Sequence, residues 1–434
     1  MIGIFKSAMK NVDTRKKIGF TFLMLIVIRL GSQIPVPGIN AEYFKSWFEQ
    51  SNSTGAFNLL SAFTGGSFER FSLFGLGITP YITASIIIQL LSIVIPALEE
   101  IQKDGEYGYQ NIEKITKYLA IGLAVFEGTA MAIGFSRSGL LPNMTVLRII
   151  IVIVSLTAGT AMLIFIGWAI DKKGIGNGIS IVLLINIVAG LPKDLVTLFD
   201  LFIKGKTIAK GILVAIIIVA IIIGVVVLVV LLNEAYRRIP IQYAQKMSGH
   251  RIGQVQKSFL PIKLNTSSVI PVIFASSIFS IPQIILTLIG KQSSNFIINC
   301  LNQSNWFSKT SPAYTVGLII YGALIYFFAY FYTSITFNPI EIADNLKKQG
   351  GTIPGIRQGK PTEEYLSKTI NKVTVLGATG LLIVVLIPTF FSCVFGANVS
   401  FGGTSLIIIV GVILETLESL DAQLQSRNYR SFLG

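Results

Sequence analysis

The sequence is poor in charged residues, and this shortage excludes most soluble protein classes. Charged residues make up 13% of the 434 positions, about half of what a soluble globular domain carries. Apolar residues make up 52%, so a large share of the apolar side chains has to face lipid. We therefore expect an α-helical membrane protein rather than a soluble enzyme.

Reactive side chains are equally scarce. Cys300 and Cys393 are the only cysteines, too few for a disulfide framework or a cysteine metal site. The only histidine, His250, falls in a polar segment, whereas an intramembrane Ser–His protease needs a histidine within a span. The sequence contains neither G-x-x-x-x-G-K-[ST] nor H-E-x-x-H, the patterns of phosphate-binding loops and zinc proteases. We expect no catalysis, no metal and no cofactor.

Long apolar runs are what the chain has in abundance. A run of about 20 apolar residues is long enough to cross a bilayer as a helix. Ten runs of this kind lie near residues 18–35, 75–95, 117–136, 148–170, 178–200, 211–232, 268–289, 313–337, 373–393 and 403–420. The strongest is 211–232, which contains no charge. The sequence predicts an all-α protein with ten transmembrane helices.

The distribution of Lys and Arg predicts the orientation, because basic loops are retained in the cytoplasm. With both termini inside, 24 of the 35 basic residues lie in cytoplasmic segments, ten in outer loops and Arg29 within the first span. This orientation places His250 inside and Cys300 outside. The lysines between Lys193 and Lys210 go against the rule. The excess of Lys and Arg in cytoplasmic segments explains most of the net charge of +14. The alternative explanation of this charge is that the protein binds nucleic acid.

An internal repeat indicates two halves. The second and seventh spans share the pattern P-x-I-x-A-S, at Pro80 and at Pro271. The copies are five spans apart, so they cross the membrane in opposite directions, as in inverted repeats. We expect one half at 1–205 and the other at 206–434, each with five spans, and a functional path where the halves meet.

Polar side chains lie on one face of both repeat spans. At 100° per residue, Ile78, Ile82 and Gln89 share a face of the second span, and Asn265 and Ile273 share one on the seventh. These faces fit a water-filled vestibule closed by aliphatic side chains. They also fit ordinary helix packing, with hydroxyls bonded to neighbouring backbone. The residues alone leave both interpretations open.

Two further segments have open interpretations. Residues 57–76 are half apolar and too broken to cross; they form either a short re-entrant helix, surrounded by protein or water, or an outer loop. Gly174-Ile-Gly-Asn-Gly follows no predicted strand and indicates a flexible start of a helix rather than a phosphate site.

An ion-coupled secondary transporter with inverted repeats is the alternative function, and Glu127 is almost the only buried carboxylate available to it.

Several longer motifs follow one another along nearly the whole chain. They are R-L-G-S-Q-I-P-V-P-G-I from Arg29, G-I-T-P-Y-I-T-A-S-I-I-I-Q-L-L from Gly77, G-I-G-N-G-I-S from Gly174, R-R-I-P from Arg237, L-P-I-K-L-N from Leu260, V-I-P-V-I-F-A-S-S from Val269, F-N-P-x-E-x-A-D-N-L-K-K from Phe337 and F-G-G-T-S-L from Phe401. Together they resemble the SecY family, the pore-forming subunits of Sec protein translocases. The resemblance implies a passive channel for unfolded secretory chains, with a side exit into lipid for apolar helices.

The resemblance also assigns roles to residues of this chain. It implies a pore ring formed by Ile78, Ile82, Ile179, Leu183, Ile273 and Ile408. It implies a re-entrant plug helix at about 57–71, with Phe57, Leu59, Phe63, Gly65, Gly66, Phe68 and Phe71. It implies a lateral gate between the second and seventh spans that includes Thr83, Gln89, Asn265 and Ile281.

The two long cytoplasmic loops, 234–267 and 341–372, resemble the family's docking surface for the SecA ATPase and for ribosomal RNA. The residues concerned are Arg237, Arg238, Lys246, Arg251, Lys347, Lys348 and Arg357. Gln358 stands where a proline is usual, and the first cytoplasmic loop lacks a common Arg-Arg pair.

The family's partners are small SecE-like and SecG-like membrane subunits, SecA, the ribosome, signal sequences, unfolded polypeptides and membrane lipid. The expected location is a bacterial plasma membrane, with the thylakoid membrane as the alternative.

Overall fold

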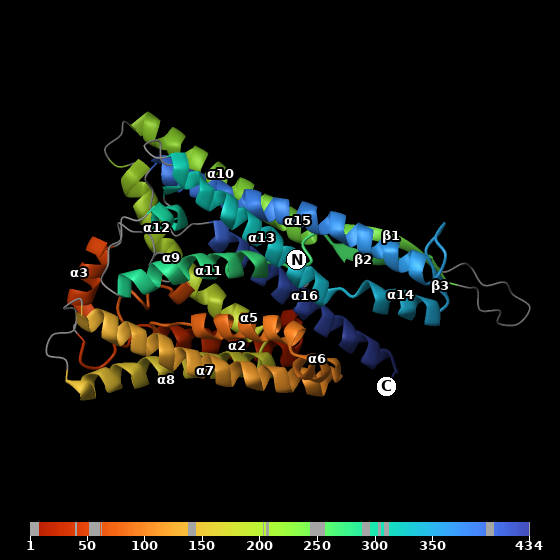
Figure 1. Cartoon of the computed structure of the whole chain (residues 1–434), viewed down its shortest axis with the longest axis horizontal. Helices are drawn as coiled ribbons and strands as arrows, with labels where there is room; N and C mark the ends of the chain where they lie inside the picture. The colour runs from red at the N-terminus through yellow and green to blue at the C-terminus, as the bar shows by residue number, and fades with distance from the viewer. Residues whose placement is uncertain are drawn as a thin grey trace, which may run out of the picture.

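The chain folds into a bundle of long helices with a small sheet at one end, as the computed structural model in Figure 1 shows. The structure describes residues 8–39, 41–51, 61, 63–137, 145–202, 204, 208–243, 257–288, 296–302, 305–307, 312–395 and 403–433. Statements below about what is absent refer to these residues.

The helices follow the apolar runs of the sequence. The first half contains α2 (Val12–Gly31), α3 (Ala41–Ser51), α5 (Thr79–Val94), α6 (Pro96–Lys103), α7 (Gly105–Arg137), α8 (Val146–Lys173) and α9 (Gly178–Phe202). The second half contains α10 (Ile208–Glu234), α11 (Ile270–Leu288), α12 (Phe296–Leu301), α13 (Thr315–Thr336), α14 (Pro339–Lys348), α15 (Lys360–Phe395) and α16 (Gly403–Leu433). A helix is therefore found at each of the expected spans.

Within the described residues, six helical segments are long and apolar enough to cross a membrane. They are α7, α8, α9, α10, α13 continued by α14, and α15. A seventh is added if α5 and α6, which are bent by 106° relative to each other, count as one span. The expectation of a helical, multi-pass membrane protein is confirmed, while the number ten stays a prediction.

Prolines determine where the two repeat helices begin and where one of them ends. Pro80 and Pro271 each occupy the second position of a helix, α5 and α11, where the missing N–H removes no helical hydrogen bond. Ile95 has extended backbone angles and precedes Pro96, as the steric restriction on a residue before proline requires. The P-x-I-x-A-S pattern therefore marks a helix start in both halves.

Segments expected on opposite sides of the membrane lie at opposite ends of the molecule. α3 and α12 lie at one end of the bundle, whereas the sheet and α14 lie at the other (Figure 1). The charge distribution had assigned α3 and α12 to the outer side and the sheet and α14 to the cytoplasm. The arrangement in space agrees with this grouping.

The sheet joins the two long basic loops. β1 (Tyr236–Tyr243) pairs antiparallel with β2 (Lys257–Lys263) and, on its other edge, with β3 (Gly351–Thr352). On the buried side of the sheet, Ile239 and Ile262 pack against Leu366 and Ile370 of α15. Apolar packing therefore holds both loops against one helix. The sequence had predicted these loops but no sheet.

Two hydrophobic clusters organise the bundle. The larger one draws buried side chains from both halves, among them Ile28 of α2 and Ile325 of α13. The smaller one lies at the α3 end and is aromatic; its Phe44 ring lies 4.8 Å from that of Phe71 and 5.1 Å from that of Phe135. The Phe44–Phe135 pair is edge to face and the Phe44–Phe71 pair is tilted, and edge-to-face pairs add to the energy of burial.

Candidate functional site

The six aliphatic residues expected to form a ring lie together in the larger hydrophobic cluster. Ile78, Leu183 and Ile408 are buried members of this cluster, while Ile82, Ile179 and Ile273 are partly exposed and pack against it. They come from α5 and the residue that precedes it, and from α9, α11 and α16. Two of these helices belong to each half, so the cluster is the place where the halves meet.

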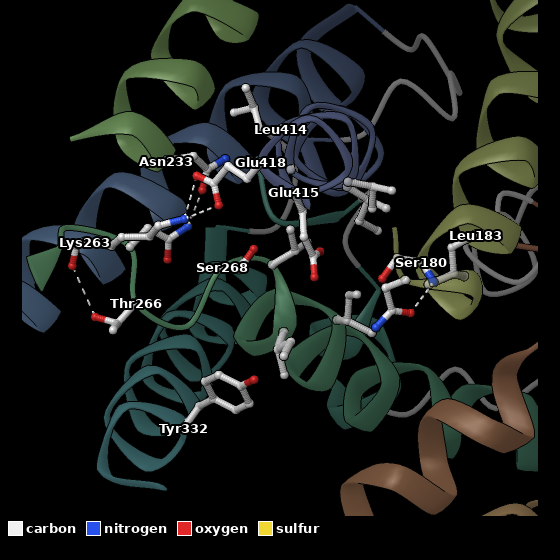
Figure 2. Close-up of a pocket in the computed structure, with 18 residues that line it drawn as sticks. Ser180, Leu183, Asn233, Lys263, Thr266, Ser268, Tyr332, Leu414, Glu415 and Glu418 are labelled. Atoms are coloured by element: carbon white, nitrogen blue, oxygen red, sulfur yellow. Dashed lines mark hydrogen bonds and ion pairs between the residues drawn. The ribbon is translucent and has the colours of Figure 1, made fainter. Parts of the chain in front are cut away.

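A cavity of about 410 Å³ adjoins this ring (Figure 2). Leu183, Ile273 and Ile408 form part of its lining. The lining also includes Asn233 in the last turn of α10 and Lys263 at the end of β2. The cavity therefore lies on the sheet side of the ring, with an aliphatic floor and a polar wall.

The polar wall is held by an ion pair and an amide pair. Lys263 Nζ donates to both carboxylate oxygens of Glu418, at 2.7 and 2.6 Å, and Asn265 Nδ2 donates to Asn233 Oδ1 at 2.9 Å. Asn265 Oδ1 and Asn233 Nδ2 are buried and have no partner among the described residues. Buried polar atoms of this kind normally bind something, so the wall offers hydrogen bonds to whatever occupies the cavity.

Sequence reasoning missed several residues of this wall. Asn233, Lys263, Tyr332, Glu415 and Glu418 all line the cavity, and only Asn265 was expected to be functional. A signal was present in Glu415 and Glu418, because these carboxylates follow the apolar first half of α16 and, three residues apart, face one side of the helix. Glu127, on which the transporter interpretation depends, is not among the described residues that line the cavity.

The contact between the halves beside the ring is apolar. Ile86 of α5, Phe274 of α11 and Phe328 of α13 are buried in one cluster, against which Ile82 and Ile273 pack. The rings of Phe274 and Phe328 meet edge to face, 5.4 Å apart. We call this contact the seam. α11 also contacts α7, so α7 and α13 take part in the seam beside the two helices that the sequence indicated.

The four residues expected at the lateral gate are not joined to one another by hydrogen bonds within the described part of the chain. Thr83 donates to the carbonyl of Thr79 on its own helix, and Gln89 Nε2 donates to Ser85 Oγ at 3.2 Å. Asn265 pairs with α10, and Ile281 on α11 is 45% exposed. Thr83, Gln89 and Ile281 lie on the two expected helices, whereas Asn265 lies in the turn before α11. Apolar side chains hold the seam.

The expected plug segment divides into two parts. Phe57 and Leu59 lie outside the described residues. Phe63 is buried in the large cluster, and Gly65 and Gly66 have left-handed φ angles of 62° and 78°. Phe68 and Phe71 instead pack with α3 and α7 in the aromatic cluster. We call Ser61 and residues 63–67 the plug tip and residues 68–71 the plug root.

The basic residues of the two long loops are exposed around the sheet. Arg237 and Arg238 lie on β1, Lys347 and Lys348 end α14, and Arg357 follows β3. Lys246 and Arg251 lie outside the described residues. Gln358, which stands in place of the usual proline, donates from Nε2 to the carbonyl of Gly351 at 3.2 Å and so ties the Arg357 loop to β3.

The fold and the site together define a class. A multi-pass helical protein in which aliphatic side chains from both halves meet beside a cavity with a polar wall is a membrane channel or transporter.

Comparison with known proteins identifies the family. The family model described as SecY matches residues 72–417. The whole chain is 41% identical, over 449 aligned residues, to the whole protein translocase subunit SecY of Streptomyces coelicolor. It is 40% identical to the subunit of the same name from Halalkalibacterium halodurans, with 97% of each chain covered. The chain belongs to the SecY family.

Solved structures show the same fold. A structure described as that of a protein conducting channel matches with a TM-score of 0.65 at 21% identity, covering 94% of this chain and 92% of the other. A structure from a study of the SecY plug domain matches with a TM-score of 0.63 at 22% identity and the same coverage. Sec61 in the canine ribosome-channel complex matches with a TM-score of 0.61 at 20% identity, again with the same coverage.

Proposed function

We propose that the chain is a protein-conducting channel, through which unfolded secretory polypeptides cross the membrane and apolar helices leave sideways into lipid. The observation that carries this proposal is the convergence of six aliphatic side chains, from both halves, beside a cavity with a polar wall. The translocase subunits to which the chain is similar over its full length support the same activity.

Aliphatic side chains suit a pore that has to accept many sequences. A narrow apolar constriction excludes water and ions by dewetting when it is empty. The same side chains make non-directional contacts with any passing chain, whereas a ring of charges would favour some sequences over others. A signal sequence, with its short apolar stretch, gains free energy when it passes through the apolar seam into lipid.

The proposed architecture has ten transmembrane helices in two halves, 1–205 and 206–434, with the segment around 57–71 as a plug. The course of the repeat helices supports it. α5 leads into α6 near the sheet end, whereas α11 follows β2 and leads toward α12 at the α3 end (Figure 1). The two helices thus run in opposite directions, as an inverted repeat requires.

The proposed surroundings follow from the family. A channel gives no direction to transport, so an external motor or the ribosome has to supply it. We assign the exposed basic residues around the sheet to docking of the SecA ATPase and of ribosomal RNA, and we place SecE-like and SecG-like subunits beside the bundle. The translocase relatives are bacterial, which supports a bacterial plasma membrane with the sheet and both termini in the cytoplasm.

Asparagine substitutions in the ring test the proposed function. Ile82→Asn and Ile273→Asn lower the cost of wetting the constriction, so we expect ion leakage through the idle protein and better export of substrates with defective signal sequences. The measurements are conductance in planar bilayers and export of a signal-defective reporter.

Ile82→Leu, which keeps the constriction apolar, is the matched control and should show no ion leakage. If Ile82 were only a core residue of a transporter, an unpaired amide would cost about 1–3 kcal/mol of stability. If both Asn variants conduct no ions in planar bilayers and export the reporter less well, the proposal is contradicted.

A further inference from the structure

The plug tip is a turn that is bonded to itself. Gly66 N donates to the carbonyl of Ser61 at 3.1 Å and Ser67 N donates to that of Thr64 at 3.2 Å. Phe68 N donates to Thr64 Oγ1 at 3.3 Å. A turn closed by three short-range hydrogen bonds moves as one body, so a few contacts with its surroundings are enough to hold it in place.

Two contacts of this kind come from α9. Asn186, which is 3% exposed, donates from Nδ2 to the carbonyl of Phe63 at 3.2 Å. Lys193 Nζ lies 2.6 Å from Glu69 Oε2, and Ser61 donates to Glu69 Oε1 at 2.8 Å. One carboxylate thus connects the start of the tip to α9. Asn186 and Lys193 are seven residues apart, about two helical turns, and present one face of α9 to the plug.

The position of Gly65 shows how closely the tip is seated. A Cβ on Gly65 would lie 2.6 Å from the carbonyl oxygen of Asn186 and 2.9 Å from Nη1 of Arg29 on α2. Arg29 Nη1 is buried and has no hydrogen-bond partner among the described residues. At Gly65 the tip therefore fits against α2 and α9 with no space for a side chain, and both helices belong to the N-terminal half.

The tip and the seam are held by different chemistry. Within the described residues, no hydrogen bond or ion pair joins the tip to residues 206–434. The seam depends instead on apolar contacts among Ile86, Phe274 and Phe328. Parting the seam therefore breaks none of the polar contacts of the tip.

We propose that Asn186 and Lys193 form a latch that seats the plug tip on the N-terminal half, so that seal and seam open in separate steps. The proposal rests on the proposed function, because it takes this segment to be the plug. Asn186 and Lys193 act as positioning residues. Release of the tip requires loss of their two contacts and does not require the halves to separate.

Charge reversal tests the latch. In planar bilayers, Lys193→Glu should raise the frequency of idle openings about two- to fivefold, the population shift expected when an exposed ion pair is lost. Glu69→Lys should do the same, and the double variant Glu69→Lys with Lys193→Glu should restore the seal. Lys204→Glu is the matched control, because it breaks the 3.0 Å pair with Asp200 near the same end of α9 without touching the plug. Equal leakage from the control, or no rescue by the double variant, would overturn the latch.

The second test asks whether the two steps are separate. Cysteines at Thr83 and Ile281, in a background with Cys300→Ala and Cys393→Ala, allow a short bifunctional thiol reagent to lock the halves together. Lys193→Glu should still leak after cross-linking, while export of a reporter stops. Loss of the leak on cross-linking would show that the tip leaves only when the seam parts, and would overturn the proposal.

Asn186→Leu adds a variant of the buried contact, and we expect about a tenfold increase in idle openings from a lost buried hydrogen bond. Unchanged idle openings would overturn the role of Asn186. Ile82→Asn is measured in parallel. If Ile82→Asn leaks and Lys193→Glu does not, the latch proposal is wrong, while the proposed function as a channel is supported. If neither leaks, the proposed function itself is contradicted.

Discussion

At the scale of single residues, adjacent glycines of the plug tip have different surroundings. Gly65 and Gly66 both have positive φ angles, 62° and 78°. A Cβ on Gly65 would meet Asn186 and Arg29, whereas a Cβ on Gly66 would have nothing within 4 Å. Both positions favour glycine for conformational reasons, and only Gly65 also favours it for lack of space.

This difference gives a prediction with a built-in control. Gly65→Ala and Gly66→Ala should each cost about 1–2 kcal/mol of backbone strain, because the left-handed conformation is unfavourable for a residue with a Cβ. Gly65→Ala should in addition displace the tip and raise the idle conductance well above that of Gly66→Ala. Planar-bilayer recordings of the two variants compare them directly. Equal conductance would show that the seat around Gly65 does not contribute to the seal.

At the scale of elements, the sheet pairs residues of the two long loops that are more than 100 positions apart in the chain. Tyr243 pairs with Gly351 and Gln242 pairs with Thr352. Gln358 adds a hydrogen bond to Gly351 from the loop that carries Arg357. The basic residues of both loops therefore move together, and a partner that binds one loop also acts on the other.

Arg357→Glu should abolish SecA-driven transport in proteoliposomes while the protein remains inserted in the membrane. The physical reason is that a reversed charge at an exposed docking position repels an acidic partner surface, which slows association and weakens the complex. Lys45→Glu, at the α3 end, is the control and should leave the rate of SecA-driven transport unchanged. Normal SecA-driven transport by Arg357→Glu would remove this residue from the docking surface.

The elements also show which features the sequence could predict. Apolar runs are local signals, so a helix at each of the expected spans was predicted correctly. The ion pair between Lys263 and Glu418 joins residues 155 positions apart, and no local pattern specifies a partner at that separation. The surroundings of Phe68 and Phe71 could not be predicted for the same reason, because the aromatic residues that bury them come from α3 and α7.

At the scale of the whole molecule, two of the lysines that go against the positive-inside rule have carboxylate partners. Lys193 pairs with Glu69, and Lys204 pairs with Asp200 at 3.0 Å. A neighbouring carboxylate offsets the charge of each lysine in the folded protein. The positive-inside rule counts Lys and Arg and not net charge, so these residues still go against it and the orientation needs a direct test.

The orientation test has to be placed at exposed positions. Cys300 was expected outside, but its side chain is only 6% exposed, and Trp306 donates to its carbonyl at 2.8 Å. Location on the outer side would therefore not make this thiol reactive. The sequence could not reveal this, because burial of a short loop helix depends on distant packing.

Cysteines at Lys45 on α3 and Lys348 on α14, both exposed, give the required pair. In intact cells, in the background with Cys300→Ala and Cys393→Ala, an impermeant thiol reagent should label Lys45→Cys and not Lys348→Cys. Lysis should make both reactive. Labelling of Lys348→Cys alone in intact cells would show that the bundle has the opposite orientation in the membrane.

The contact between Glu69 and Lys193 spans 124 residues, and this separation sets an order of events during synthesis. The plug tip leaves the ribosome long before Asn186 and Lys193, so it has no seat until α9 has been made and inserted. Its hydrogen bonds and ion pair, as far as the described residues show, involve nothing made later than α9. The plug tip can therefore be seated on the N-terminal half before α10 is translated, while the ring still lacks Ile273 and Ile408, which are made later with α11 and α16.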